Sequence, residues 1–403
     1  MSKDNREVNQ AEQSSDEPVL SNVQLSEQIM IKKTKKIEDE AYEVASQYKL
    51  MWWKFRKHRL ATIAGPILIF MLFLAVFAEF LSPVNPIRRY TEHLHAPPAT
   101  VRFIRADGSF SIRPFVYFVE MHRNPHTFRR EYRETPARKY YLSLFSGGEE
   151  YMLWGIIPMR VRFIGLSGVD YTDYNFFILG TDSLGRDLFS RILHGTRVSL
   201  SFGFVSIIFT FIIGLTLGAL AGYLGGIVDN IIMRVIEVLQ CMPAIPLWMA
   251  LAAALPREWT PLRIYLGMVL IMSLIGWTHL ARVTRGYILS TREEDFIMAA
   301  RLSGTGHWAI IRKHLIPSFI SFIIVSLTLS IPGSILGETA LSFLGLGLQP
   351  PVMSWGVLLI ESQTLQTLAH HPWLLWPAVP VIVTVLMFNF LGDGLRDAAD
   401  PYK

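Results

Sequence analysis

The chain has 403 residues, of which 51% are hydrophobic and 18% charged, and its mean hydropathy is positive. This is more apolar surface than a soluble domain needs, and it indicates a protein that spans a membrane. The net charge of +5 reflects basic residues placed beside apolar segments, so we do not expect nucleic-acid binding. Cys241 is the only cysteine, which excludes a disulfide within the chain.

The first segment, residues 1–50, is rich in Ser, Gln, Glu, Asp and Lys and poor in apolar residues. This composition is typical of a disordered cytoplasmic tail. No apolar core lies near Met1, so we predict no signal peptide. Residues 51–81 follow and contain an apolar run at 61–81 that is long enough to span a bilayer as an uncleaved anchor helix.

Residues 82–177 are too polar to lie in the membrane and too long to form a turn. Residues 101–118 alternate between apolar and polar types around Asp107 and Gly108, which is a strong hairpin signal. Residues 159–164 alternate in the same way. We expect a small extracytoplasmic unit that contains β-structure. It could be a decoration packed on the outer membrane face or a contact surface for a solute-binding partner.

The remaining segment, residues 178–403, contains five more apolar runs of membrane-spanning length. Helices are expected because they satisfy their backbone hydrogen bonds within each segment. With the anchor helix they give six spans. The five runs are residues 198–224, 231–255, 264–281, 319–341 and 373–391.

Basic residues predict the orientation of these spans. Four lysines and arginines stand at 54–59, at the start of the first span, and more lie in the loop 285–317. The loop 342–372 has neither lysine nor arginine. Cytoplasmic loops carry the excess of basic residues, so both termini and the loop 285–317 are expected in the cytoplasm.

Glycines recur at every fourth position late in the second span, at Gly214, Gly218, Gly222 and Gly226. This spacing places them on one face of a helix, where they allow another helix to approach closely. We expect them to serve packing, either within the bundle or against a sister subunit.

The loop 285–317 predicts two short helices joined by a sharp turn. Thr291 to Glu294 has the spacing of a capping box, and acidic Glu294 and Asp295 would favour the positive end of the helix dipole. The helix should continue through Ala299 and Ala300.

Gly304 is a natural residue for ending this first helix in a left-handed conformation. Thr305 could then cap a second helix that begins near His307 and ends before Pro317. The small side chains of Ala299 and Ala300 would let the loop fit closely into a groove of a partner.

Catalytic motifs are missing from the sequence. It has no Gly-Lys dipeptide and therefore no Walker A phosphate loop, and it has neither a His-Glu-x-x-His nor a Gly-x-Ser-x-Gly motif. We therefore expect no catalytic residues and no cofactor, with energy supplied by a partner. His370 and His371 lack nearby carboxylates or thiolates in the sequence, so we expect interfacial packing there and no metal site.

Several of these segments together resemble the inner-membrane permease subunit of an ATP-binding-cassette importer of the oligopeptide and dipeptide type. The resemblance covers residues 180–401. The loop keeps the pattern of the family's coupling helix, with Met298 and His314 as departures from it. The residues that match this pattern are Ala299, Ala300, Gly304, Ile316 and Pro317.

Other matching segments are residues 180–200, 218–234, 338–347 and 392–397. We interpret residues 180–200 as an amphipathic interfacial helix at the entry to the bundle. Its charged residues could pair with one another or with lipid headgroups. Glu237, Glu338 and Asp393 lie near predicted span ends, where snorkelling or a salt bridge between subunits is expected.

The resemblance implies an all-α polytopic membrane protein with the type I importer fold, six helices and the β-containing insert. It implies one half of a translocation pathway in a bacterial inner membrane. The implied partners are a homologous second permease, two ABC ATPase subunits, an extracytoplasmic solute-binding protein and the lipid bilayer. The cargo would be peptides, with nickel complexes or oligosaccharides as alternatives.

Two other classes of protein would explain the apolar spans. An ion-coupled secondary transporter predicts charged relays within the spans and two inverted repeats, and neither is apparent. A membrane-embedded hydrolase would need a nucleophile and a base, and the sequence offers no such set.

Overall fold

The computed structural model describes residues 47–105, 108–126, 128, 130–167, 176–256 and 258–399. The predicted tail lies outside this range except for its last four residues. Those residues begin helix α3 (Gln47–Lys57), which carries Lys54, Arg56 and Lys57 in its last turn.

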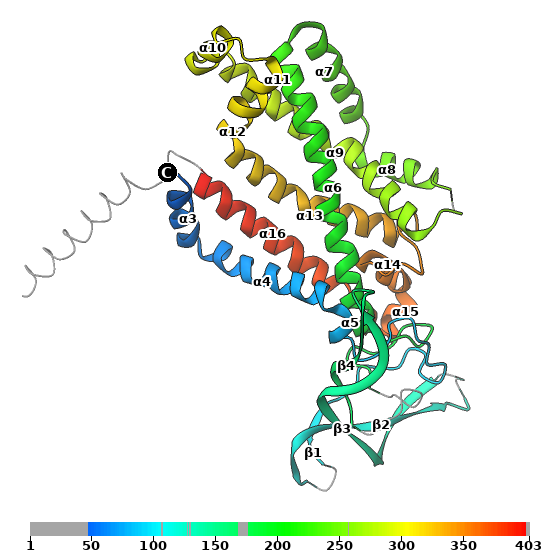
Figure 1. The fold of residues 1–403 in the computed structure, drawn as a ribbon. Helices are drawn as coiled ribbons and strands as arrows, with labels where there is room; N and C mark the ends of the chain where they lie inside the picture. The colour runs from blue at the N-terminus through cyan, green and yellow to red at the C-terminus, as the bar shows by residue number, and fades with distance from the viewer. Residues whose placement is uncertain are drawn as a thin grey trace, which may run out of the picture.

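Five long apolar helices form the bundle (Figure 1). Each is long and apolar enough to cross a membrane, which agrees with five of the six predicted spans. They are α4 (Arg59–Val76), α6 (Leu188–Leu224), α9 (Pro261–Thr291), α13 (Ile320–Phe343) and α16 (Ala378–Ala399).

The sixth predicted span, residues 231–255, is a bent pair of helices. Helix α7 (Gly226–Cys241) and helix α8 (Ala244–Ala253) meet at an angle of 90°. Pro243 causes the break, because proline lacks an N–H and disfavours a helical conformation in the residue before it. Met242 is accordingly extended, with φ of −89° and ψ of 135°. The described chain therefore has five spans, or six if the bent pair counts as one.

Helices α6 and α9 pack closely through the glycine face. A Cβ atom at Gly214 would lie 3.0 Å from the Trp277 carbonyl oxygen, and one at Gly218 would lie 2.5 Å from that of Ala281. Gly222 faces α9 in the same way. Gly226 departs from the prediction, because Gly225 (φ +66°) ends α6 and places Gly226 in α7, where a Cβ would meet nothing within 4 Å.

The insert contains a four-stranded antiparallel sheet in the order β1-β2-β3-β4, which confirms the predicted β-structure. Gly108 has φ of +80°, as a hairpin turn requires, and the Arg105 N–H donates to the Ser109 carbonyl at 2.9 Å. Asp107 lies outside the described residues. The strands are β1 (Arg102–Ile104), β2 (Phe110–Arg123), β3 (Arg130–Leu153) and β4 (Ile157–Leu166).

Short helical segments complete the two ends of the bundle. Figure 1 shows the sheet, α5, α14 and α15 near one end and α10 and α11 at the other, with α6 running between them. These ends are called the sheet end and the hairpin end below. At the hairpin end lie α10 (Asp295–Leu302), α11 (His307–Ile310), η2 (Ile311–Leu315) and α12 (Ile316–Ser318). At the sheet end lie α5 (Ala78–Leu81), α14 (Trp355–Leu359), η3 (Ile360–Ser362), α15 (Leu365–His370) and η4 (Pro372–Leu375).

Candidate coupling site and buried polar cluster

Helix α10 begins at Asp295, one residue after Glu294, whose carbonyl accepts from Ile297 N at 2.9 Å. Asp295 lies in the first turn, where an acidic side chain is favoured by the helix dipole. The capping-box prediction is wrong, because α9 continues through Thr291 and no side chain caps α10. Arg292 N still donates to the Ile288 carbonyl at 2.8 Å.

The inner face of α10 packs against the bundle. Ile297 is fully buried and Ala300 is 9% exposed, and both join a core cluster with Leu215 and Ile288. Ala299 is exposed. The two alanines therefore face in different directions, which corrects the expectation that both fit into a partner's groove. Ala300 is small because it packs against its own chain.

The turn after α10 is built around Gly304. Gly304 has φ of +78°, and its N–H donates to the Arg301 carbonyl at 3.0 Å. Thr305 N donates to the Ala300 carbonyl at 3.1 Å. This pair of bonds is a Schellman motif, which favours glycine at the left-handed position. Thr305 does not cap the next helix, because Gly306 occupies that position without a side-chain bond.

His307 attaches α11 to the end of α6. Its Nδ1 lies 3.1 Å from the hydroxyl of Tyr223, and the Arg301 guanidinium lies 5.1 Å from the centre of the same ring. The second helix does not end before Pro317. It continues through the π-helical turn η2, which widens the backbone, into α12, where Pro317 lies in the first turn and needs no N–H partner.

Four large apolar side chains of the hairpin are exposed. Phe296 is 46% exposed, Met298 45%, Leu302 87% and Trp308 53%. We call these four side chains the outer face. Beneath the hairpin, α7 and α9 are joined by an ion pair in which Arg285 donates to both carboxylate oxygens of Asp229.

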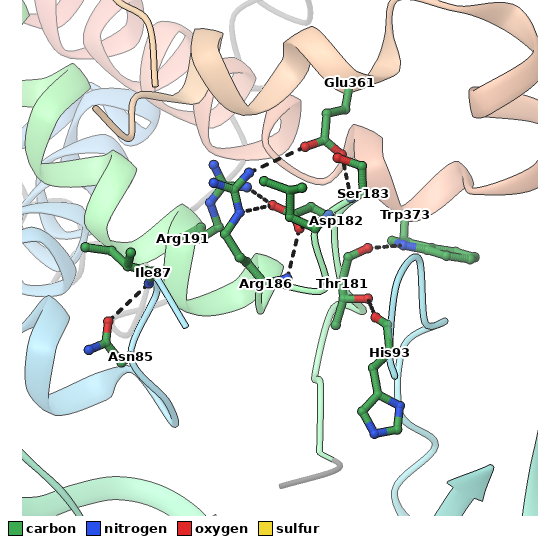
Figure 2. A network of polar contacts seen from close by, with 11 residues as sticks. Asn85, Ile87, His93, Thr181, Asp182, Ser183, Arg186, Arg191, Glu361 and Trp373 are labelled. Carbon is green, nitrogen blue, oxygen red and sulfur yellow. Dashed lines mark hydrogen bonds and ion pairs between the residues drawn. The ribbon is translucent and has the colours of Figure 1, made fainter. Parts of the chain in front are cut away.

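A buried polar cluster occupies the sheet end (Figure 2). Asp182 is 1% exposed and accepts from Arg191 and, at 2.6 Å, from Arg186. Glu361 accepts from Ser183 N at 2.8 Å and lies 3.7 Å from Arg186. The cluster therefore joins the start of α6 to the η3 segment.

The prediction of an amphipathic interfacial helix over residues 180–200 holds only in part, because residues 188–200 are the first turns of the long helix α6. Residues 180–187 form a loop, since Gly180 and Gly185 have φ of +80° and +72°. Helix α6 starts at Leu188 with Asp187 as its cap, which accepts from Ser190 N at 2.8 Å. Burial raises the pKa of the Asp187 carboxyl to about 6.

Thr181 joins the same loop to the insert. Its hydroxyl donates to the His93 carbonyl and accepts from Ala96 N at 2.7 Å, while its carbonyl accepts from the Trp373 indole at 3.1 Å (Figure 2). The insert is therefore fixed to the permease core by backbone and side-chain bonds at the sheet end.

Two histidines stack where the insert meets the loop after α15. The rings of His95 and His371 are parallel, with their centres 4.2 Å apart. Burial lowers the pKa of His371 to about 4, and the charges of His95 and His370 act in the same direction. Burial also lowers the pKa of His95. Within the described residues no cluster of three or more His, Cys, Asp or Glu could hold a metal ion.

Glu338 lies in the bundle interior and does not snorkel as expected. It is fully buried and accepts from Ser342 at 2.8 Å and from Ser199 at 3.3 Å. Ser199 in turn accepts from Trp355 N at 3.1 Å, which ties α6, α13 and α14 together. The spacing of Glu338 and Ser342, one helical turn apart, is the sequence signal that could have revealed this bond. Glu237 pairs with Arg234 on the exposed surface of α7.

Comparison with known proteins places this architecture in a family. Residues 214–402 match the family model for the inner-membrane component of binding-protein-dependent transport systems. Residues 46–98 match the model for the N-terminal transmembrane domain of oligopeptide transport permease C. Most of the insert lies between the two matched segments.

Sequence relatives support the same assignment. A glutathione transport system permease protein from Pectobacterium atrosepticum is 42% identical, over 55% of this chain and 72% of the relative. A dipeptide transport system permease protein from Bacillus subtilis is 40% identical, over 55% of this chain and 68% of the relative. An oligopeptide transport system permease protein from Haemophilus influenzae is 41% identical, over 57% and 70%.

A solved methionine ABC transporter in an inward-facing conformation is 18% identical over 51% of this chain and 95% of the solved chain, with a TM-score of 0.40. The family is shown by the sequence relatives. The chain belongs to the family of inner-membrane components of binding-protein-dependent transport systems, as a permease subunit of the ATP-binding-cassette type. It is a multi-pass membrane protein, and the predicted fold class is confirmed.

Proposed function

We propose that this chain forms half of the translocation pathway of a bacterial inner-membrane importer for peptides or similar small solutes. The relatives are named for dipeptide, oligopeptide and glutathione transport, which supports this cargo class. Its partners would be a homologous second permease, two ABC ATPase subunits and an extracytoplasmic solute-binding protein. In this scheme residues 51–81 anchor the chain, 82–177 form the extracytoplasmic insert, and 178–403 form the permease core.

The proposal rests on the contrast between buried and exposed side chains of the hairpin. The inner face of α10 is part of the bundle core, while the outer face exposes four large apolar side chains. Large apolar side chains exposed on a loop that we expect in the cytoplasm favour a protein partner. The ATPase is the partner proposed for it.

Movement of that partner would reach the spans through the core cluster. Ile297 and Ala300 of α10 pack in one cluster with Leu215 of α6 and Ile288 of α9. The same cluster reaches Ile323 of α13. Because a packed interior transmits displacement with little compression, a push on α10 would tilt three spans together. The protein would act as a lever and a conduit.

A pocket between α9, α13 and α16 fits a role in translocation. It has a volume of about 530 Å³ and is lined by His279, Ser326, Ser330, Arg396 and apolar side chains. A second permease placed against this concave side would complete an enclosed pathway. Pockets of this size accept small solutes.

The test uses Leu302→Glu in the complete transporter reconstituted into vesicles. Leu302 is 87% exposed and contributes to no core cluster among the described residues, so the variant should fold and assemble normally. We expect substrate-stimulated ATP hydrolysis and transport to fall at least tenfold, because a charge would be buried at the interface.

Leu365→Glu is the matched control, since Leu365 is 81% exposed on α15 at the sheet end. It should leave both activities unchanged. Equal activity of Leu302→Glu and the unmodified transporter would refute coupling through the outer face.

A further inference from the structure

The turn between β3 and β4 folds back to the sheet end of α4. The Trp154 indole N–H donates to the Val76 carbonyl at 2.8 Å, and its ring lies 5.8 Å from that of Phe77. Val76 is the last residue of α4. Figure 1 shows β4 close to α5, the short helix that follows this span. The sequence between the two family-matched segments contains this turn.

The turn is apolar and exposed. Met152 is 49% exposed, Trp154 48%, Ile156 75% and Ile157 45%. We call residues 152–157 the tip. Its backbone is tightly turned, with φ of +54° at Trp154 and +72° at Gly155, and Ile156 N donates to the Leu153 carbonyl at 3.1 Å. The tip is a fixed structure that presents apolar side chains outward.

The tip lies at the level where α4 leaves the membrane. Helix α4 has 18 residues and measures about 27 Å at 1.5 Å per residue. The hydrocarbon core of a bilayer is about 30 Å thick, so if α4 begins at one boundary near Arg59, Val76 lies close to the other. A side chain held against the Val76 carbonyl is therefore at the interface between acyl chains and headgroups.

Aromatic rings connect the tip to the exposed side of α4 without a gap. Phe70 stacks on Phe73 at 6.5 Å, Phe73 contacts Phe77 at 4.8 Å, and Phe77 contacts Trp154. Phe70 is 56% exposed and Phe73 45%. The surface of the span thus continues directly onto the tip.

We propose that the tip inserts into the outer leaflet of the bilayer and holds the sheet against the membrane. Tryptophan is favoured at this depth because its ring is apolar and its N–H is polar. Ile156, as the most exposed side chain of the tip, would contact acyl chains. Arg160, 73% exposed on β4, would lie near the phosphate groups. This role depends on α4 spanning the membrane and is independent of any coupling to an ATPase.

The hairpin formed by β1 and β2 provides the contrast. Phe110 is 70% exposed and Ile112 is 88% exposed on β2. The sheet order places β1 and β2 on the side away from β4, whereas the tip precedes β4 and is bonded to α4. Both hairpins therefore expose apolar side chains. The tip differs from the β1–β2 hairpin in lying beside α4.

The experiment measures spin-label accessibility in the complete transporter, reconstituted into phosphatidylcholine vesicles. A nitroxide is attached at Ile156→Cys in a Cys241→Ser background, and relaxation by oxygen is compared with relaxation by a water-soluble nickel chelate. Oxygen concentrates in the bilayer, so the oxygen-to-nickel ratio should be several-fold higher at Ile156 than at the matched control, Ile112→Cys.

Two results would overturn the proposal. A ratio at Ile156 equal to that at Ile112 would place the tip in water, and shielding from both reagents would place it against protein. A second label at Met152→Cys keeps the test independent of one site. With Ile156→Asp added, the ratio at Met152 should fall toward the water value, and an unchanged ratio would contradict insertion.

Discussion

At the scale of single residues, burial separates charged groups that look equivalent in the sequence. Asp182 and Arg191 are both buried, with at most 4% of each residue exposed, and they form an ion pair. Arg160 and Glu150 form an ion pair on the surface. A buried ion pair depends on both partners, because removing one leaves an uncompensated charge in a low dielectric. A surface pair is screened by water.

Asp182→Ala should therefore destabilise the protein strongly. We expect a loss of about 3–5 kcal/mol in the free energy of unfolding, since Arg191 would remain buried without its carboxylate. Arg160→Ala is the control, with an expected change of about 0–1 kcal/mol. Denaturant unfolding in detergent measures both, and similar effects of the two variants would be inconsistent with a structural role for the cluster.

The stacked histidines predict a pH dependence. The pKa of His371 is about 4 in the folded chain, mainly because of burial, against an ordinary value of 6.5. At pH values between 4 and 6.5, His371 binds more protons in the unfolded chain than in the folded chain. The stability contributed by the stack is therefore complete above about pH 6.5 and is lost as the pH falls toward 4. Burial is also the main cause that lowers the pKa of His95. The charges of Glu361 and Asp182 raise that pKa, and the charge of Arg130 lowers it.

His371→Phe keeps a ring in the stack and removes its titration. The unmodified protein should lose more thermal stability than this variant between pH 7 and pH 5. The measurement is the melting temperature at both pH values, with His122→Phe on exposed β2 as the control. An identical pH response in the His371 variant would show that the stack does not titrate.

At the scale of secondary-structure elements, the contact between α6 and α9 depends on glycine. A Cβ at Gly218 would lie 2.5 Å from the Ala281 carbonyl oxygen and 2.8 Å from its Cα. These are backbone atoms, so the helices themselves would have to separate. A Cβ added at Gly286 on α9 would meet no atom within 4 Å.

Gly218→Ala should cost about 1–3 kcal/mol through overpacking. Gly286→Ala should be neutral or stabilising by about 0.5–1 kcal/mol, because alanine favours a helix more than glycine does. Unfolding in detergent distinguishes the two. Tolerance of alanine at both positions would mean that the close approach of α6 and α9 is not required.

At the scale of the whole molecule, the sheet and the α10 hairpin lie at opposite ends of the bundle (Figure 1). The basic residues near α3 and in the loop 285–317 favour the cytoplasmic side for the hairpin end. The sheet end would then face outward.

Cysteine labelling in a Cys241→Ala background checks this orientation. Ile112→Cys, on the sheet, should react with a membrane-impermeant reagent in intact cells. Ser290→Cys, near the end of α9, should react only after the membrane is opened. Labelling of Ser290→Cys from outside would contradict the proposed topology.

The sequence by itself determined the features that depend on local pattern. Apolar runs of sufficient length predict the spans, and Gly304 adopts the left-handed conformation that its place after α10 requires. The break at Pro243 was not predicted, because the apolar run at residues 231–255 indicates one continuous span. Alternation around Gly108 likewise predicts a hairpin from neighbouring residues alone.

Only the tertiary structure decided which side chains meet across long stretches of chain. Ala299 and Ala300 are adjacent and identical, yet one is exposed and the other is buried against α6 and α9. The hydrogen-bond partners of Arg191, Glu338 and Trp154 come from other parts of the fold. The physical reason is that burial and pairing depend on the packing of helices and strands in space, and a periodic pattern in the sequence does not specify that packing.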